Sequence, residues 1–286
     1  MTAEEAAPLP DIDAEVAVQV IAGFIRSQLA QSGFSRLVVG LSGGVDSATT
    51  AFLASRAVEP GNLLALRMPY RTSSADSEAD AQLVVDALGC QTERIDITPM
   101  ADPMLAQISG PDAEARVRRG NVMARLRMIV LYDRSAAFDA LVIGTSNKTE
   151  ALLGYGTLYG DMAAALQPIG DLYKSQLRAV AGCLGVPEPI LDKPPSADLW
   201  PGQTDEDELG APYQDLDRVL YALVDRRWSQ DRCVRAGMDA RLVKRVASTV
   251  ARTEYKRQLP PVAKVSLRTP GIDHLYPRRR PGSRRS

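Results

Sequence analysis

Histidine and cysteine are scarce in this chain. Its 286 residues include one histidine, His274, and three cysteines, Cys90, Cys183 and Cys233. The cysteines are far apart, so they form neither a paired disulfide framework nor the ligand spacing of a metal site. His274 stands beside a run of arginines near the end of the sequence, and we interpret it as a residue of a terminal tail rather than a catalytic base.

The chain also lacks long apolar runs and net charge. A membrane-spanning helix needs about 18 apolar residues, but even residues 141–143 are bounded by polar residues and glycine. Residues 1–10 contain no apolar signal core. The 34 basic residues are balanced by 35 acidic ones, which gives no overall attraction to nucleic acid or membrane. We expect a cytoplasmic protein that binds neither.

Strand-like and helix-like segments alternate along the chain. Strands are predicted at residues 36–41, 62–68, 93–97 and 140–144, and helices at residues 13–31, 47–57, 76–88 and 114–138. The helical segments are long enough for crossovers between parallel strands. The expected fold class is α/β, a doubly wound, mainly parallel sheet with helices on both faces. Ligands of such sheets bind beyond the carboxyl ends of the strands.

A glycine-rich loop follows the first predicted strand. Residues 40–47 are Gly40, Leu41, Ser42, Gly43, Gly44, Val45, Asp46 and Ser47. Glycines let the backbone approach an oxyanion closely, and the helix that follows directs the positive end of its dipole to the same point. The loop predicts a phosphate site, although an ordinary strand-to-helix turn can have similar residues.

No lysine closes this loop, unlike in the Walker motif, where a lysine reaches the terminal phosphates. Asp46 stands there instead, and its hard oxygen favours a divalent metal that supplies the missing positive charge. The arrangement resembles the pyrophosphatase loop of the ATP pyrophosphatases. These enzymes cleave ATP between the α and β phosphates to adenylate a carboxylate or a similar oxygen.

A second polar segment follows the strand predicted at residues 140–144. It contains Thr145, Asn147 and Glu150, which we expect at the same edge of the sheet as Asp46. Glu150 would complete a magnesium site with Asp46 and ATP oxygens, because magnesium takes one or two carboxylates plus phosphates and waters. Alternatively, residues 145–147 cap a helix and Glu150 complements its dipole. The sequence leaves both interpretations open.

Further motifs occur in a fixed order, at residues 119–121, 124–128, 154–161, 195–199, 204–210 and 254–260. With the loop, they resemble the NAD synthetase family in its ammonia-dependent form, which lacks a glutaminase domain. The resemblance spans roughly residues 15–260. It implies a Rossmann-like fold of the adenine nucleotide alpha hydrolase type.

The resemblance implies a ligase that converts deamido-NAD to NAD in two steps. ATP adenylates the nicotinate carboxylate with release of pyrophosphate, and ammonia then displaces AMP. The site must bring two anions together, which requires magnesium and basic side chains. By resemblance, the catalytic residues are Asp46, Glu150 and Lys174, of which Asp46 and Glu150 hold magnesium. The implied ATP contacts are residues 40–47, Arg67 near the adenosine, Thr145, Lys174 and Ser196.

The same resemblance places the second substrate on Asn121, Arg125, Leu158, Asp161, Ala165, Tyr255 and Lys256. Three of these depart from the family pattern, because many members have a lysine in place of Leu158, an aspartate in place of Ala165 and a histidine in place of Tyr255. The ATP half is intact, whereas the dinucleotide half is changed. We favour an altered binding mode. A different carboxylate or nucleotide substrate, or a non-catalytic nucleotide sensor, is the alternative.

Several of these residues have plain structural interpretations as well. Arg125 stands among arginines that would form the solvated face of a helix, and Lys174 opens an amphipathic helix as a surface cation would. Ser196 follows two prolines, so a rigid turn with a helix cap would explain it.

The sequence also leads to expectations about the nitrogen donor and the domain organisation. A triad-type glutaminase needs a cysteine nucleophile and a histidine base, so we expect free ammonia or ammonia delivered by another protein. Residues 1–270 are expected to form one domain, with a helical C-terminal part at residues 205–260. In the resembled family such helices help to form a homodimer. The basic residues 271–286 predict a disordered tail.

Overall fold

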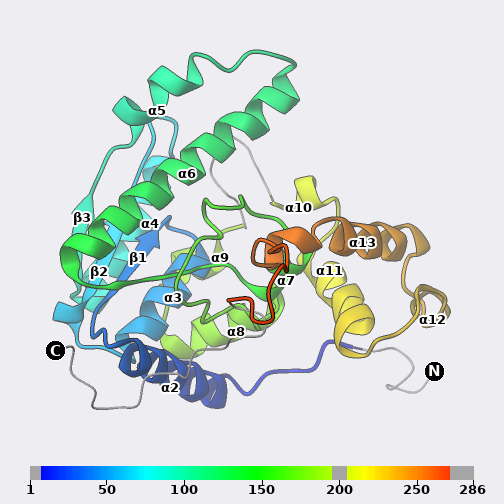
Figure 1. Ribbon diagram of the computed structural model, residues 1–286. Helices are drawn as coiled ribbons and strands as arrows, with labels where there is room; N and C mark the ends of the chain where they lie inside the picture. The colour runs from blue at the N-terminus through cyan, green and yellow to red at the C-terminus, as the bar shows by residue number, and fades with distance from the viewer. Residues whose placement is uncertain (1–7, 195–204, 271–286) are drawn as a thin grey trace.

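A parallel sheet forms the core of the larger part of the molecule, on the left in Figure 1, and the C-terminal helices lie to its right. The computed structural model describes residues 8–194 and 205–270, apart from the side chains of residues 112 and 113. In this part of the chain the sheet consists of β1 (Leu37–Leu41), β2 (Leu63–Arg67), β3 (Gln91–Arg94) and β4 (Leu141–Ile143). The strands are parallel and lie in the order β3-β2-β1-β4. The predicted parallel α/β fold is confirmed.

Helices cover both faces of this sheet. One face packs against α2 (Ala14–Ser32), α3 (Val45–Ser55), α4 (Ala75–Leu88), α8 (Lys174–Leu184) and α9 (Glu188–Asp192), and the other against α5 (Thr98–Leu105) and α6 (Asp112–Phe138). Side chains of β1 alternate between them, with Leu37 and Val39 in the first core and Val38 in the second. A strand buried on both faces explains why its sequence is a continuous apolar run.

Two elements differ from the sequence prediction. The third strand was expected at residues 93–97, but β3 begins at Gln91, ends at Arg94 and exposes its side chains at the edge of the sheet. The apolar signal came from Ile97, which is fully buried in the core beside the sheet rather than in the strand. Helix α5 was not predicted, because it is short and contains Pro103.

The C-terminal part of the chain is helical and has its own core. It contains α10 (Asp205–Leu209), α11 (Tyr213–Leu220), the π-helical η2 (Tyr221–Asp225), α12 (Gln230–Arg235), α13 (Ala240–Arg252) and η3 (Glu254–Arg257). Together with α7 (Lys148–Leu153), these elements bury a cluster that includes Leu216, Trp228 and Val246. A short helix, η1 (Pro60–Asn62), precedes β2.

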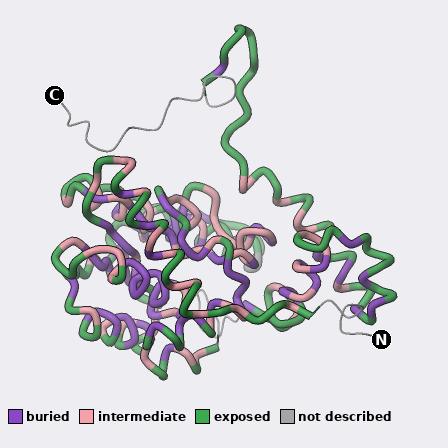
Figure 2. The backbone as a smooth tube through the Cα atoms, turned by 90° about the horizontal axis from the view of Figure 1, so that it is seen from below, coloured by how far each residue is buried: buried purple, intermediate pink, exposed green. Residues whose placement is uncertain are grey.

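The chain after η3 contains no helix in the described residues. Figure 2 shows it as a mostly exposed arm, residues 258–270, that leaves the body of the protein. The predicted helical segment at residues 205–260 therefore ends at Arg257. The predicted tail at residues 271–286, with His274, lies outside the described residues. Among the described helices, none is both long and apolar enough to cross a membrane.

Candidate active site

The glycine-rich loop connects β1 to α3 at the carboxyl edge of the sheet. Gly43 has φ +78°, and a Cβ atom on it would lie 2.3 Å from the carbonyl oxygen of Ser77 in α4. Only glycine meets both conditions without strain. Position 43 of the predicted loop therefore requires glycine, in part because α4 packs directly against it.

Two serines hold the loop in shape. The Ser42 amide donates to Ser47 Oγ at 3.2 Å, and Ser47 Oγ donates to the Gly44 carbonyl at 3.0 Å. No side chain of the described residues caps α3 at Gly44. The backbone N–H groups of the first helical turn, which lack partners within a helix, are thus directed at the space beyond the loop, as in anion sites.

A second segment meets this loop across the sheet, at the end of β4. Because β1 and β4 are adjacent and parallel, residues after Leu41 and after Ile143 share one edge. Here the chain passes from the β1-β2-β3 side to the β4 side, the switch point at which doubly wound sheets bind ligands. Asn147 joins the two segments, since its Nδ2 donates to Asp46 Oδ1 at 2.8 Å.

Asn147 also caps α7. Its Oδ1 accepts a hydrogen bond from the Glu150 amide at 3.0 Å, which places Glu150 in the first turn of the helix. The capping interpretation of this segment is therefore correct for Asn147. Glu150 nonetheless faces Asp46, so the two interpretations do not exclude each other. Thr145 lies between β4 and α7 at the same edge.

Lys174, the first residue of α8, lies between the two carboxylates. Its ammonium pairs with Asp46 Oδ2 and lies 3.4 Å from Glu150 Oε1. The side chain is only 3% exposed, against 19% for Asp46 and 16% for Glu150. The interpretation of Lys174 as a surface cation is therefore wrong. A lysine from 128 residues away supplies the charge that the loop lacks.

Burial sets the ionisation of this cluster. Burial, and then the charge of Asp46, raise the pKa of Glu150 to about 8, although Lys174 acts in the opposite direction. Burial alone would lower the pKa of Lys174, but the charges of Asp46 and Glu150 raise it above its usual value. Lys174 therefore stays protonated, while Glu150 takes up a proton more readily than an ordinary glutamate.

The pair Asp46 and Glu150 fits magnesium in its donor chemistry, because both present carboxylate oxygens at one edge. The described residues contain no group of three or more His, Cys, Asp or Glu side chains able to hold a metal ion. A magnesium ion here would depend on phosphate oxygens and waters for its other ligands, which is usual for this ion. The Lys174 ammonium balances one of the two carboxylate charges.

A network of aromatic hydroxyls behind Lys174 was not predicted from the sequence. Asp205 is 4% exposed and accepts hydrogen bonds from Tyr155 Oη at 3.0 Å and Tyr213 Oη at 3.1 Å. Lys174 Nζ lies 5.2 Å from the centre of the Tyr213 ring. Burial raises the pKa of Asp205. Tyr155 lies in the loop after α7, Asp205 on α10, Tyr213 on α11 and Lys174 on α8, so no single sequence motif contains the whole network.

Arg67 ends β2 beside the loop, paired in register with Leu41. Its Nε is buried and has no hydrogen-bond partner in the described residues. A buried guanidinium nitrogen without a partner is unfavourable unless a ligand or water completes it. This geometry supports the predicted nucleotide contact of Arg67.

Most residues predicted for the second substrate gather around the turn at residues 154–161. Asn121 Oδ1 accepts from Thr157 Oγ1 at 2.8 Å, and Arg125 Nη2 donates to the Leu158 carbonyl at 3.3 Å. Asp161 Oδ1 accepts from the Thr157 amide at 2.7 Å. Both side chains on α6 thus contact the turn.

Lys256 holds the same turn from the other side. Its ammonium donates to the carbonyls of Gly154 at 2.8 Å and Gly156 at 2.7 Å. Tyr255 next to it is 62% exposed, and Ala165 is exposed on the strand-like segment that pairs with β4. The predicted residue Ser196 lies outside the described residues.

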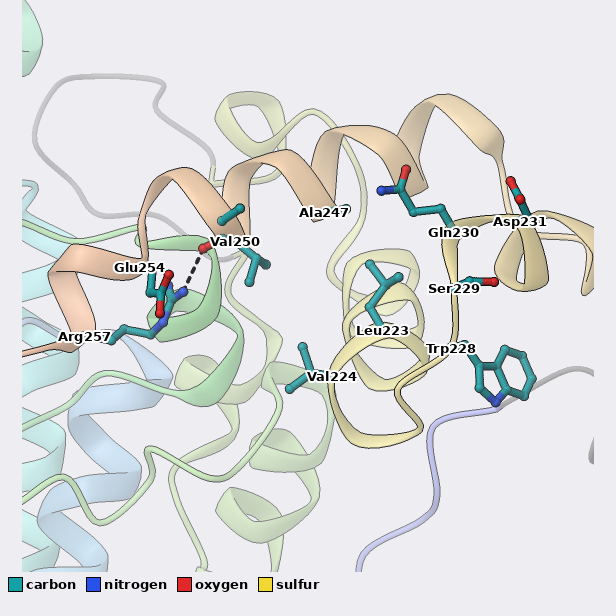
Figure 3. Close-up of a pocket in the computed structure, with 11 residues that line it drawn as sticks. Leu223, Val224, Trp228, Ser229, Gln230, Asp231, Ala247, Val250, Glu254 and Arg257 are labelled. Carbon is teal, nitrogen blue, oxygen red and sulfur yellow. Dashed lines mark hydrogen bonds between the residues drawn. The ribbon is translucent and has the colours of Figure 1, made fainter.

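A separate groove of 840 Å³ lies between η2, α12 and α13 (Figure 3). Leu223, Val224 and Trp228 line it, and Arg257 at one end donates to the Val250 carbonyl at 2.7 Å. Among the residues that the structure describes, none of those predicted for the site lines this groove. The candidate site is therefore the edge formed by β1, β4 and α8.

The fold and this edge together define an α/β nucleotide-binding enzyme with a phosphate loop and a buried lysine between two acids. The model of the family described as NAD synthase matches residues 17–260, so the chain belongs to the NAD synthase family. A relative from Chlorobaculum tepidum, named NH(3)-dependent NAD(+) synthetase, is 51% identical over 91% of this chain and 92% of its own.

Two solved structures are similar as well. The NMN synthetase of Francisella tularensis has a TM-score of 0.76 and 33% identity, over 88% of this chain and 99% of its own. The NH3-dependent NAD synthetase of Campylobacter jejuni has a TM-score of 0.74 and 33% identity, over 88% of this chain and 100% of its own. The resemblance seen in the sequence motifs is confirmed.

Proposed function

We propose that this protein catalyses the ATP-dependent amidation of deamido-NAD to NAD with ammonia, releasing pyrophosphate and AMP. The observation that carries the proposal is the cluster of Asp46, Glu150 and Lys174 beside the phosphate loop, in a chain 51% identical to a named NH(3)-dependent NAD(+) synthetase. A cation between two acids at a phosphate site suits the release of pyrophosphate, because negative charge grows on the departing oxygen.

In this proposal, residues 40–47 bind the ATP phosphates through backbone N–H groups. Lys174 neutralises the leaving pyrophosphate, and Arg67 and Thr145 contact the nucleotide. Asp46 and Glu150 hold magnesium, which when bound supplies positive charge to the phosphate oxygens. Ser196 remains a prediction for the nucleotide site.

Asn121, Arg125 and Asp161 form the second pocket in this proposal, with Leu158, Ala165, Tyr255 and Lys256 at its border. Lys256 acts there through the turn at residues 154–156, whose carbonyls it binds. The homodimer, the cytoplasmic location and the supply of free ammonia stay predictions from the sequence.

Amidation of the acid mononucleotide, to give NMN, is the second candidate. Two observations favour it: the similarity to a structure named NMN synthetase, and the departures at Leu158, Ala165 and Tyr255, all in positions expected to contact the dinucleotide. A substrate without the adenylate half would not need those contacts.

Pyrophosphate release tests the proposal. With ATP, magnesium and ammonia, we expect release that depends on deamido-NAD and exceeds that with nicotinate mononucleotide at least tenfold in kcat/KM. The reverse ratio would favour the NMN reaction. Release independent of any carboxylate, or nucleotide binding without release, would contradict both.

The Asp46→Asn variant tests the site itself. We expect loss of pyrophosphate release, because the amide binds neither the metal nor the Lys174 ammonium as an anion does. Stability should fall by only about 1.5–3 kcal/mol, the usual contribution of a hydrogen bond to a charged group. Loss of the cooperative thermal transition would instead indicate a structural role for Asp46.

A further inference from the structure

Asp217 is a fully buried carboxylate on α11 that lies outside the predicted site. It is 0% exposed, and its hydrogen bonds lead to the two segments that carry the acid and lysine cluster. Its Oδ1 accepts a hydrogen bond from Thr149 Oγ1, and its Oδ2 accepts from the Ser175 amide at 2.9 Å and Ser175 Oγ at 2.7 Å. Three donors satisfy a charge that would otherwise be costly to bury.

These contacts flank the cluster directly. Thr149 precedes Glu150, and Ser175 follows Lys174. Thr149 Oγ1 also accepts the backbone N–H of Lys174 at 3.0 Å. One carboxylate therefore joins the first turn of α7 to the first turn of α8, and fixes their separation.

Helix α11 contacts the lysine at a second point, through the Tyr213 ring 5.2 Å from its ammonium. Figure 1 shows α11 beside α7. Asp217 and Tyr213 are four residues apart and therefore lie on one face of the helix. This face thus contacts the Lys174 ammonium through Tyr213 and the next backbone amide, that of Ser175, through Asp217.

We propose that Asp217 is a positioning residue for the reaction: it holds Lys174 and Glu150 at the distance that lets the ammonium meet the leaving pyrophosphate. The inference rests on the proposed function. Asp217 touches neither the phosphate loop nor Asp46, so its effect passes through Thr149 and Ser175. A displacement of about 1 Å at such a site is enough to reduce turnover about 100-fold.

The chain offers a matched control in Asp225. This carboxylate on η2 joins the same two segments through side chains alone, Lys148 Nζ at 2.8 Å and the hydroxyl of Tyr173. Neither contact touches Lys174 or Glu150. The Asp225 side chain is 32% exposed, whereas Asp217 is fully buried, so the loss of unfolding free energy is measured for both variants beside kcat. A positioning role makes Asp217 affect turnover beyond what its loss of stability explains, whereas Asp225 affects stability alone.

The test compares Asp217→Asn with Asp225→Asn, and uses Asp215→Asn on the exposed face of α11 as a surface control. We expect Asp217→Asn to lower kcat for pyrophosphate release about 10- to 100-fold with less than threefold change in KM for ATP, since a displaced cation acts on the transition state. Asp225→Asn and Asp215→Asn should stay within twofold in kcat. Equal losses in Asp217→Asn and Asp225→Asn, or an unchanged Asp217→Asn, would overturn the proposal.

A pair of Thr149 variants covers the case in which Asp217→Asn does not fold. Thr149→Ser retains the hydroxyl and should keep kcat within threefold. Thr149→Val removes it at similar volume and should lose as much kcat as expected for Asp217→Asn. A fully active Thr149→Val variant would contradict the proposal.

The rate at which Lys174 is acetylated tests the positioning role without any substrate, and therefore independently of the proposed function. Trace labelling followed by mass spectrometry should show Lys174 modified at least threefold faster, relative to the exposed Lys244, in Asp217→Asn than in wild type. This readout needs no substrate. If wild type releases no pyrophosphate with any carboxylate, the proposed function fails, and unchanged labelling of Lys174 overturns the positioning role independently.

Discussion

Gly43 shows how one residue of the phosphate loop depends on a distant helix. Its φ of +78° and the 2.3 Å distance that would separate a Cβ atom from the Ser77 carbonyl oxygen are separate conditions, and both favour glycine. The loop sequence predicted the phosphate site from the close approach to an oxyanion that glycine allows and from the dipole of the following helix. The second condition depends on where α4 packs, which the glycine pattern does not contain.

The Gly43→Ala variant should therefore bind ATP weakly and lose more than about 1 kcal/mol of unfolding free energy, because alanine is strained at positive φ. Denaturant unfolding and nucleotide titration measure the two effects. Gly23→Ala is the control, since Gly23 lies within α2 and nothing approaches its Cβ position within 4 Å. It should be neutral or stabilising by up to about 1 kcal/mol. Similar behaviour of both variants would contradict the packing argument.

Other residues of the site differ in how far the sequence predicts them. Asp46 and Glu150 were expected to meet, because the carboxyl ends of parallel strands share an edge. The inward position of Lys174 was known only through the family resemblance, since its amphipathic helix also fits a surface cation. Asp205 lies in the recognised motif at residues 204–210, but its contacts with Tyr155 and Tyr213 were not predicted. Asp217 gave no signal, because its partners come from distant elements and an isolated acid in a helical stretch is common.

At the scale of elements, the joint between the helical C-terminal part and the sheet domain has polar contacts beside its apolar cluster. Asp225 at the end of η2 binds Lys148 and Tyr173, which begin or precede α7 and α8. Burial alone would raise the pKa of Asp225, but the hydrogen bonds from Lys148 and Tyr173 lower it below its usual value. The joint therefore depends on an ionised carboxylate.

The lowered pKa of Asp225 predicts how the free energy of unfolding changes with pH. A carboxyl whose pKa is lower in the folded than in the unfolded state stabilises the fold above its unfolded pKa of about 4, and this contribution is lost as pH falls through the folded value. Asp225→Asn should lose about 1.5 kcal/mol at pH 7, and the difference from wild type should shrink toward pH 3. Urea unfolding across this range measures it.

Asp171→Asn is the control for that experiment. Asp171 lies 3.1 Å from the same Lys148 ammonium, but its side chain is 96% exposed. Exposed ion pairs contribute about 0.2–1 kcal/mol, so this variant should change stability little at any pH. If Asp171→Asn lost as much unfolding free energy as Asp225→Asn, the stabilising effect of Asp225 would not depend on its burial in the joint.

The sequence predicted those elements whose position depends on burial alone. Strands β1, β2 and β4 are buried on both faces, which gives a continuous apolar run in the sequence. The edge strand β3 exposes its side chains, so its boundaries were misplaced. The end of the helical region at Arg257 was also close to the prediction, because Pro260 and Pro261 follow it.

At the scale of the whole molecule, the arm at residues 258–270 leaves apolar side chains without cover. Leu259 is 84% exposed, and Val265 and Leu267 are each 95% exposed. Association of two chains would remove such side chains from water. The predicted homodimer would have a surface of this kind to cover.

We expect sedimentation equilibrium at micromolar concentration to give twice the 30.9 kDa of one chain. A Val265→Ser, Leu267→Ser double variant should dissociate at higher concentration than wild type, with an unchanged circular dichroism spectrum. An exposed apolar residue outside the arm, Val117, is 58% exposed and serves as the control in Val117→Ser. A monomeric wild type would contradict the dimer.

The hydrogen bonds of Asp217 to Thr149 and Ser175 also have a consequence for folding during translation. A chain emerging from the ribosome presents the phosphate loop first, but its lysine partner follows 128 residues later and the carboxylate that holds the lysine later still. Domains generally fold from the N-terminus as they are made. The nascent protein thus carries a phosphate loop long before Lys174 can be held beside it, and any product cut short before α11 would lack turnover even though its sheet is complete.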